Sequence, residues 1–232
     1  MTVSNKWMND SDKIVRIFVV RHGQTEWNIK RILQGHSNIP INETGKQQAA
    51  LLGKRLKDYE FDYVITSDLK RCLQTLAQVL GEDRFEDADL NIKKTKNFRE
   101  RYMGDVEGMH IQDAREKFGP GFRDRGETRD SMLKRMDGEW ERLLTDSVDC
   151  GYKNVLMCAH GGVITNFFNY LHHEKNYKLG SDLKAEDLKV PYNTSLTIVD
   201  VTRNDLSDGT IQVWASTAHL GGVKSVADQQ LV

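Results

Sequence analysis

A histidine that directly follows an apolar run has the neighbours that a nucleophile requires. Residues 14–28 read IVRIFVVRHGQTEWN, and the apolar part stops at Arg21, His22 and Gly23. A nucleophilic histidine needs a rigid support, a cation that holds an anionic substrate, and a small residue where that substrate approaches closely. The run supplies the support, Arg21 the cation and Gly23 the small residue. His22 is therefore the first candidate for catalysis, with attack on an anionic centre as its chemistry.

A second histidine stands in a similar setting. His160 follows the short apolar run 155–159 and precedes Gly161 and Gly162, and a helix-like stretch extends from 163 to about 172. Both histidines thus come directly after a strand-like segment. The repeated order of strand, histidine and glycine predicts that two distant parts of the chain present an imidazole in the same way.

Hydrophobic patterning predicts the strands that carry these side chains. Residues 14–20 are almost continuously apolar and rich in β-branched residues, which indicates a central parallel strand buried on both faces. The last two predicted strands are joined by a short polar link, residues 203–209, which allows a hairpin, so one of them is expected to run antiparallel. The predicted strands are residues 14–20, 61–66, 91–98, 155–159, 195–201 and 211–215.

Helical patterns alternate with these strands. Thr44 is a candidate cap for a helix that extends to about residue 58, and Ser67 or Asp68 for a helix that ends at Gly81. The other predicted helices cover residues 111–118, the segment around 133–144, and 163–172.

The alternation of strands and helices predicts a three-layer α/β/α sandwich, with a mostly parallel six-stranded sheet and one antiparallel strand. Such sheets bind ligands at the carboxyl ends of their strands, where His22 and His160 both fall. No linker or repeat divides the 232 residues, so we expect a single domain over 1–232 with a polar N-terminal extension at 1–13.

The composition of the chain argues against some classes of binding partner. With 33 basic and 34 acidic residues the net charge is −1, which provides no overall field for nucleic acid or an anionic membrane. No apolar run approaches the roughly 18 residues of a spanning helix. Three cysteines are an odd number and indicate reduced thiols. We expect a cytoplasmic protein, with nuclear access open, that binds small molecules rather than nucleic acid or membrane. Its oligomeric state has no signal in the sequence.

Five short segments in order resemble the histidine phosphatase (phosphoglycerate mutase-like) superfamily. They are Arg21-His22-Gly23, Asn28, Ser67-Asp68-Leu69-Lys70-Arg71, Phe98-Arg99-Glu100 and Ala159-His160-Gly161-Gly162. The likeness extends from about residue 14 to about residue 220. It is greatest to the cofactor-independent, broad-specificity phosphatase branch, which includes fungal cytosolic members. The resemblance implies small-molecule phosphate esters as substrates, with no cofactor and no metal.

The resemblance also implies how the phosphoryl group is held and attacked. His22 is the nucleophile that forms a phosphohistidine, and nearby cations favour its neutral ring. Arg21 and Arg71 bind the phosphate, because two guanidiniums and a helix N-terminus can hold its charge without a metal. Arg71 falls in the first turn of its helix, so its side chain leans toward the rim where His22 lies.

The remaining roles come from the same likeness. His160 and the Gly161 N–H are expected to donate to the phosphoryl oxygens. Asn28 and Gln34 match positions that donate to phosphate in the phosphatase branch. Glu100 is the general acid and later the base. That role requires a carboxyl that holds its proton, which burial favours and Arg99 and Arg101 oppose if they face it. Glu107 and Asp105 are alternative acids.

Two further features of the sequence suggest other binding roles. His22, His36, His160 and Glu100 together would make a metal site, although no His-x-x-x-His or Cys-x-x-Cys spacing supports one. Gly126-Glu127-Thr128 resembles the family's Gly-Glu-Ser segment before a helix. The nearby Arg123, Arg125 and Arg129 are candidates to contact a second anionic group of the substrate.

Three functions remain open at this point: a broad phosphomonoesterase, a narrow phosphoglycerate mutase or sugar bisphosphatase, and a catalytically idle module that binds phospho-ligands. A mutase must retain the same intermediate and exclude water. The chain resembles the mutase branch at residues 100–104 but lacks its paired arginines, aromatic-aspartate pair and proline run. We therefore expect hydrolysis.

Overall fold

A mixed sheet forms the centre of the computed structural model, which describes residues 7–87 and 90–226. In this part of the chain seven strands lie in the order β3-β2-β4-β1-β6-β7-β5. Only β6 pairs antiparallel with its neighbours, β1 and β7, as the predicted hairpin requires; the other neighbouring pairs are parallel. The strands are β1 (Ile14–Arg21), β2 (Tyr63–Ser67), β3 (Ile92–Thr95), β4 (Asn154–Ala159), β5 (Lys178–Leu179), β6 (Leu196–Thr202) and β7 (Asp205–Ser216).

The sheet has one strand more than the sequence predicts, and β7 begins at Asp205, inside the segment predicted as a polar link. Six strands were predicted, and the seventh is β5, which has two residues and pairs with β7 at the edge of the sheet. Two residues are too few to produce the alternation by which a strand is recognised. The predicted three-layer architecture with one antiparallel strand is confirmed.

The helices flank the sheet, and two of them begin differently from the prediction. Asn42, not Thr44, caps α2: its Oδ1 accepts from the Gly45 N–H at 2.8 Å, whereas Thr44 is already inside the first turn. Leu69 is the cap position of α3 and provides no side-chain cap. The α-helices are α1 (Glu26–Ile29), α2 (Glu43–Leu56), α3 (Lys70–Leu80), α4 (Glu82–Phe85), α5 (Ile111–Phe118), α6 (Arg129–Asp149) and α7 (Gly161–His173).

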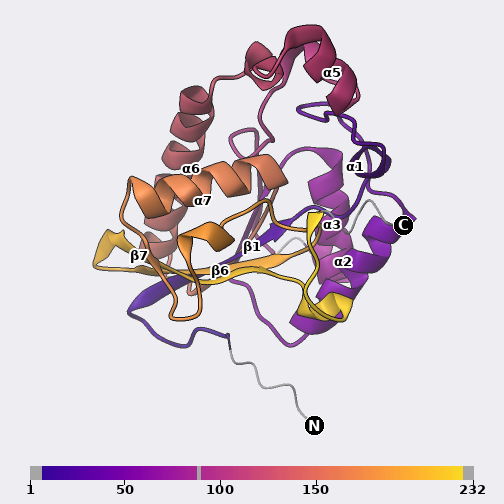
Figure 1. The fold of residues 1–232 in the computed structure, drawn as a ribbon. Helices are drawn as coiled ribbons and strands as arrows, with labels where there is room; N and C mark the ends of the chain where they lie inside the picture. The colour runs from indigo at the N-terminus through magenta and orange to yellow at the C-terminus, as the bar shows by residue number, and fades with distance from the viewer. Residues whose placement is uncertain (1–6, 88–89, 227–232) are drawn as a thin grey trace.

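Strand β1 shows why both faces of the sheet are covered. Val15, Ile17 and Val19 join the apolar core shared with α6 and α7, while Phe18 and Val20 face the core shared with α2 and α3. Successive side chains of a strand point to opposite faces, so a continuous apolar run requires a helical layer on each side. Figure 1 shows these two pairs of helices on either side of the strands.

A strap of residues 104–128 rises beyond the two layers. It contains α5 and two 3₁₀ turns, η1 (Gly104–Val106) and η2 (Phe122–Arg125), and Figure 1 shows α5 at the top of the molecule. Val106, Ala114 and Phe122 form a small apolar cluster with Leu33 of the loop after β1. The strap is therefore packed against the loop that leaves the central strand.

The expected N-terminal extension is partly built into the fold. Residues 1–6 lie outside the described residues, but Asn9 is buried and exchanges hydrogen bonds with Asn154: Asn9 N donates to Asn154 Oδ1 at 2.9 Å and Asn154 Nδ2 donates to Asn9 O at 3.0 Å. These bonds fix the chain at the start of β4. Across the described ranges, no helix has the length and apolar content needed to span a membrane.

Candidate active site

The two histidines singled out in the sequence lie side by side. β1 and β4 are parallel neighbours with Arg21 opposite Ala159, so the residues that follow them, His22 and His160, leave the sheet at the same edge. Their ring centroids are 5.2 Å apart and their planes are inclined by 57°. The carboxyl-end rule for parallel strands thus places both imidazoles where the sequence predicts.

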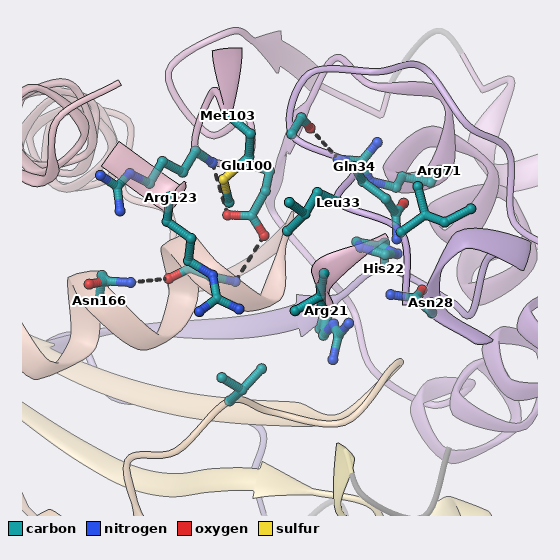
Figure 2. A pocket seen from close by; sticks show the side chains of 16 residues that line it. Arg21, His22, Asn28, Leu33, Gln34, Arg71, Glu100, Met103, Arg123 and Asn166 are labelled. Carbon is teal, nitrogen blue, oxygen red and sulfur yellow. Dashed lines mark hydrogen bonds between the residues drawn. The ribbon is translucent and has the colours of Figure 1, made fainter. Parts of the chain in front are cut away.

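A cavity of about 420 Å³ opens at this edge of the sheet. Figure 2 shows His22, Asn28 and Arg71 on one side of it and Glu100 on the other. Six of the predicted site residues line it: Arg21, His22, Asn28, Gln34, Arg71 and Glu100. The other two contact these residues from behind. His160 accepts a hydrogen bond from Arg71, and a Cβ on Gly161 would come within 3.0 Å of Arg21 Nε.

The ring of His22 is neutral and has one nitrogen without a proton. Its Nδ1 lies 2.7 Å from the carbonyl oxygen of Gly23, which can only accept, so Nδ1 carries the proton and Nε2 presents its lone pair. Burial, together with the charges of Arg71 and Arg21, lowers the pKa of His22 well below 6.5. Asn193 Nδ2 donates to the His22 carbonyl at 2.8 Å and holds the backbone. The ring therefore stays unprotonated at neutral pH.

Arg21 and Arg71 are buried cations without a carboxylate partner among the described residues. Arg71 donates to two loop carbonyls, of Ser37 at 2.8 Å and Gly35 at 2.9 Å, and Arg21 donates to Pro191 O at 2.6 Å. Arg21 Nε has no hydrogen-bond partner. Burial lowers the pKa of Arg21 to about 10 and also lowers the pKa of Arg71. Because buried charges are normally paired, an anion in the cavity would stabilise these two guanidiniums.

His160 has partners within the protein for both ring nitrogens. Arg71 Nε donates to its Nδ1 at 3.0 Å, which leaves the proton on Nε2, 2.8 Å from Ser67 Oγ. Burial and the charge of Arg71 lower its pKa well below 6.5. The ring is thus neutral and orients Arg71. The expected donation to a phosphoryl oxygen stays a prediction, and it requires His160 to exchange Ser67 for substrate.

Asn28 presents its amide donor to the cavity. Its Oδ1 accepts from Thr25 N at 3.0 Å and Thr25 Oγ1 at 3.1 Å, so the capping box of α1 fixes the side-chain orientation. Nδ2 is left to face the cavity that the residue lines. Gln34 also lines the cavity, and its buried Oε1 has no hydrogen-bond partner. Both amides lie where the sequence predicts donors to a bound anion.

Glu100 sits at the N-terminus of α7, in surroundings that the sequence does not predict. Oε1 accepts from Val163 N at 3.0 Å and Arg101 N at 2.9 Å, and Oε2 accepts from Gly162 N at 2.9 Å. These three backbone N–H donors fix the orientation of the Glu100 carboxyl group at the helix N-terminus. Oε2 has a single donor, which leaves it room for a proton.

The alternative acids are engaged elsewhere. Glu107 accepts from His36 N at 2.8 Å, Met103 N at 3.1 Å and Ser37 Oγ at 3.1 Å, and Asp105 forms a bidentate ion pair with Arg125. Neither lines the cavity as the described residues form it. Of these three carboxyl groups, Glu100 is the one that lines the cavity together with His22.

The three arginines that were candidates to contact a second anionic group differ in their surroundings. Arg123 lines the cavity, and neither an acidic partner nor a hydrogen bond is found for its guanidinium among the described residues. Arg125 pairs with Asp105, and Arg129 pairs with Glu174 at 3.2 Å. Only Arg123 of the three is placed to meet a substrate.

Gly23 is needed for a different reason from the one the sequence suggests. A Cβ there would lie 2.7 Å from the carbonyl oxygen of Gly45 in α2, so it would strike a helix backbone rather than an incoming substrate. The Gly23 N–H donates to Thr75 Oγ1 at 2.8 Å. Gly23 therefore lets the loop after β1 approach α2 and α3.

The sequence analysis did not identify two residues that support the site. Thr75 joins Gly23 to α3, and Asn193 holds the carbonyl of His22. Thr194 beside it has a φ of 57°, which a β-branched residue rarely adopts, and its N–H donates to Arg21 O at 3.0 Å. Two features of the sequence could have identified them: Thr75 is a polar residue on the apolar face of α3, and residues 193–195 are three successive polar residues before β6.

The metal-site alternative lacks a ligand set. Within residues 7–87 and 90–226, no three His, Cys, Asp or Glu side chains gather closely enough to hold a metal ion. His36, one proposed ligand, instead lies with Nε2 at 2.8 Å from the Glu100 carbonyl oxygen. The geometry fits an anion between guanidiniums better than a cation.

Fold and site together define a class: an α/β/α protein with a neutral histidine at a strand end, in a cavity that two buried arginines also line. A family model described as histidine phosphatase superfamily (branch 1) matches residues 17–215. The chain belongs to the histidine phosphatase superfamily.

Relatives and solved structures agree with this membership. The chain is 40% identical over 230 residues to a broad-specificity phosphatase of Saccharomyces cerevisiae, covering 96% of this chain and 95% of that protein. It is 32% identical to a protein of Schizosaccharomyces pombe whose name also describes a phosphatase, covering 89% and 95%. A phosphoglycerate mutase structure from Bacillus anthracis has a TM-score of 0.73 at 22% identity, covers 94% of this chain and 97% of that chain, and shows the shared fold.

Proposed function

We propose that this protein hydrolyses small-molecule phosphoric monoesters through a phosphohistidine on His22, without a metal or cofactor. The observation that carries the proposal is the free Nε2 of His22 in a cavity with two buried guanidiniums, Arg21 and Arg71, that no described carboxylate neutralises. The phosphatase names of its yeast relatives support the same activity. The chain is a phosphoric monoester hydrolase of its superfamily.

In the first step His22 Nε2 attacks phosphorus and the ester P–O bond breaks. The leaving oxygen takes the proton from Glu100 Oε2, whose single backbone donor leaves space for it. The ring becomes positively charged, and the bond from Nδ1 to Gly23 O, at 2.7 Å, stabilises that charge.

The transferring group is held by charge and by oriented donors. Arg21 and Arg71 neutralise the phosphoryl oxygens, and the amides of Asn28 and Gln34 donate to them. His160 keeps the Arg71 guanidinium in place through the 3.0 Å bond from Nε. Because these groups are fixed before substrate arrives, little reorganisation accompanies transfer.

In the second step Glu100, now a carboxylate, takes a proton from water. The water oxygen attacks phosphorus, the P–N bond breaks, and phosphate leaves with His22 again neutral. The lowered pKa of His22, caused by burial and the two arginines, makes the ring a good leaving group in this step. Water enters by the same cavity as the substrate.

The cavity walls support a broad range of leaving groups. Beyond the charged floor, apolar side chains of Ile32, Leu33, Met103, Ile111 and Val190 line it. Apolar contact tolerates leaving groups of different shape, whereas a set of directional bonds would select one. Arg123 additionally favours esters with a second anionic group. The narrow mutase or bisphosphatase alternative is not favoured.

A metal-free turnover screen tests the proposal. Wild type, His22→Ala and Glu100→Gln are assayed with chelator on an aryl phosphate and on a set of phosphorylated metabolites. We expect chelator-insensitive hydrolysis, loss of turnover in His22→Ala, and a Glu100→Gln defect that is greatest on poor leaving groups. Poor aryl phosphate turnover with one strongly preferred metabolite would favour the narrow alternative, and phosphate binding without turnover would favour the binding module.

We also propose that the protein works as one domain in the cytoplasm, with neither nucleic acid nor membrane as a partner. Cys72, Cys150 and Cys158 are all free, and Cys150 is exposed, which suits a reducing compartment. Fractionation of cells that express the tagged chain tests this location.

A further inference from the structure

Glu100 lies in a segment that has neither helix nor strand to hold it. Residues 96–103 connect β3 with η1 and are irregular throughout. A proton donor must stay within hydrogen-bond reach of the leaving oxygen, and a misplacement of about 1 Å can cost on the order of 10²-fold in rate. The segment therefore needs bonds from elsewhere in the molecule.

Arg135 of α6 supplies three of these bonds, each to a backbone carbonyl of the segment. Its Nη1 donates to Asn97 O at 2.6 Å and to Arg99 O at 2.9 Å, and its Nη2 donates to Glu100 O at 3.1 Å. The remaining donors make a bidentate pair with Glu127, at 2.6 and 2.8 Å. All five guanidinium N–H groups are thus used, three of them on the segment that carries Glu100.

Glu127 holds the segment on the C-terminal side of Glu100. Its N–H donates to Tyr102 O at 2.8 Å, and its Oε2 accepts from Tyr102 N at 3.4 Å. The Arg135 and Glu127 side chains are only 17% and 12% exposed, so solvent weakens this pair little. Backbone groups on both sides of Glu100 are therefore fixed to one ion pair.

We infer that Arg135 is a positioning residue that holds Glu100 where its carboxyl can exchange a proton with the leaving oxygen. Arg135 does not line the cavity that the described residues form, so its effect passes through Glu100 rather than through substrate contact. A lysine cannot replace it, because an ammonium lacks the planar fork that bonds three carbonyls and a carboxylate together. The inference rests on the proposed function, since it takes Glu100 as the acid.

The test is the dependence of kcat/KM on the leaving group, measured over aryl phosphates from 4-nitrophenyl to phenyl phosphate. General acid catalysis matters most when the leaving oxygen is basic. Arg135→Gln and Arg135→Lys should lose at least about tenfold on phenyl phosphate but less than about threefold on 4-nitrophenyl phosphate, part of the 10²–10⁴-fold range of general acids. In the double variant with Glu100→Gln, Arg135→Gln should add little further loss.

Arg99→Ala is the matched control. Arg99 belongs to the same segment and makes a bidentate pair with Asp68, at 2.6 Å for both bonds, with 24% and 23% of the side chains exposed. Its removal takes away a similar ion pair while the Arg135 bonds remain. The control should leave the leaving-group dependence unchanged. Glu127→Gln, which keeps shape and removes charge, provides a milder variant if Arg135→Gln does not fold.

The outcomes separate this inference from the proposed function. If Glu100→Gln steepens the leaving-group dependence but the Arg135 and Glu127 variants lower all rates by one common factor, the positioning role is wrong and the proposed function stands. If Glu100→Gln leaves the dependence unchanged, both the acid assignment and the role of Arg135 are wrong. A steepening in Arg99→Ala equal to that in Arg135→Gln would also overturn the inference.

Discussion

At the scale of single residues, two adjacent basic side chains show how the fold divides charge. Lys70 and Arg71 begin α3, and Arg71 is fully buried at the cavity while Lys70 is exposed. The desolvated guanidinium has no described carboxylate to balance it. Its hydrogen bonds to Ser37 O, Gly35 O and His160 offset part of the cost of burying Arg71, and an incoming phosphate supplies the paired charge that offsets more of it.

Arg71→Gln should therefore lower kcat/KM by about 10²–10³-fold, the range seen when a group that stabilises transition-state charge is removed. The loss follows from weaker charge neutralisation and from the loss of the bond to His160. Steady-state kinetics on an aryl phosphate measures it. Lys70→Ala, one residue away, should stay within about twofold of wild type. Equal losses in the two variants would contradict the role given to Arg71.

The site residues differ in how far the sequence predicts them. Arg21, His22 and His160 are anchored to strand ends, and the carboxyl-end rule applies to any parallel pair. The surroundings of Glu100 depend on N–H groups of Gly162 and Val163, over sixty positions away. Such a contact leaves no local pattern, so its nature emerges only in the folded chain.

At the scale of elements, the N-terminus of α7 is where the site is assembled. Gly161 leaves space for Arg21, and a Cβ on Gly162 would come within 2.5 Å of Glu100 Oε1. Two successive glycines thus let one guanidinium and one carboxylate share a helix end. The helix begins directly after His160, so one turn of chain brings three of the proposed site groups together.

Gly162→Ala should displace the Glu100 carboxylate and lower kcat/KM on phenyl phosphate by at least about tenfold, with a smaller effect on 4-nitrophenyl phosphate. The reason is steric, because the added methyl meets the carboxylate. Gly138→Ala in α6 is the control: beyond the backbone of its own helix turns, a Cβ there meets no atom within 4 Å, and the change should stabilise the helix by about 0.5–1 kcal/mol. Wild-type kinetics in Gly162→Ala would refute the steric argument.

Element boundaries were predicted where the pattern is local. α5 begins and ends at the predicted residues, 111 and 118, because an apolar stripe and Gly119 define it. The start of α2 was misplaced because Asn42 and Thr44 both have capping side chains, and backbone geometry decides between them. The arrangement of the strap follows from its packing on Leu33, which no periodicity encodes.

At the scale of the whole molecule, buried neutral histidines connect the site to stability. Burial and nearby guanidiniums lower the pKa of His22 and His160 well below 6.5, and burial with the charge of Arg55 lowers the pKa of His219 to about 4. In the unfolded chain each has a pKa of about 6.5. Below that pH the unfolded chain binds protons that the folded chain does not.

The free energy of unfolding should therefore fall as pH decreases from about 6.5 toward 4, by up to about 1.4 kcal/mol per pH unit for each histidine that stays neutral. Urea unfolding at pH 7.5, 6.5 and 5.5 measures this. His219→Gln should show a smaller decrease over the same interval, whatever its stability at pH 7.5. An unfolding free energy that is constant or rises from pH 6.5 to 5.5 would contradict the neutral state of these rings.

Hydrolysis by the proposed route requires a covalent bond between His22 and phosphorus, and trapping that bond tests it most directly. Glu100→Gln protein, in which attack by water is slowed, is mixed with 4-nitrophenyl phosphate, quenched in alkali and analysed by peptide mass spectrometry. We predict an alkali-stable, acid-labile phosphoryl group on His22. It should be absent from the double variant that carries both Glu100→Gln and His22→Ala. A phosphoryl group on another side chain, or turnover of His22→Ala at the wild-type rate, would contradict the account.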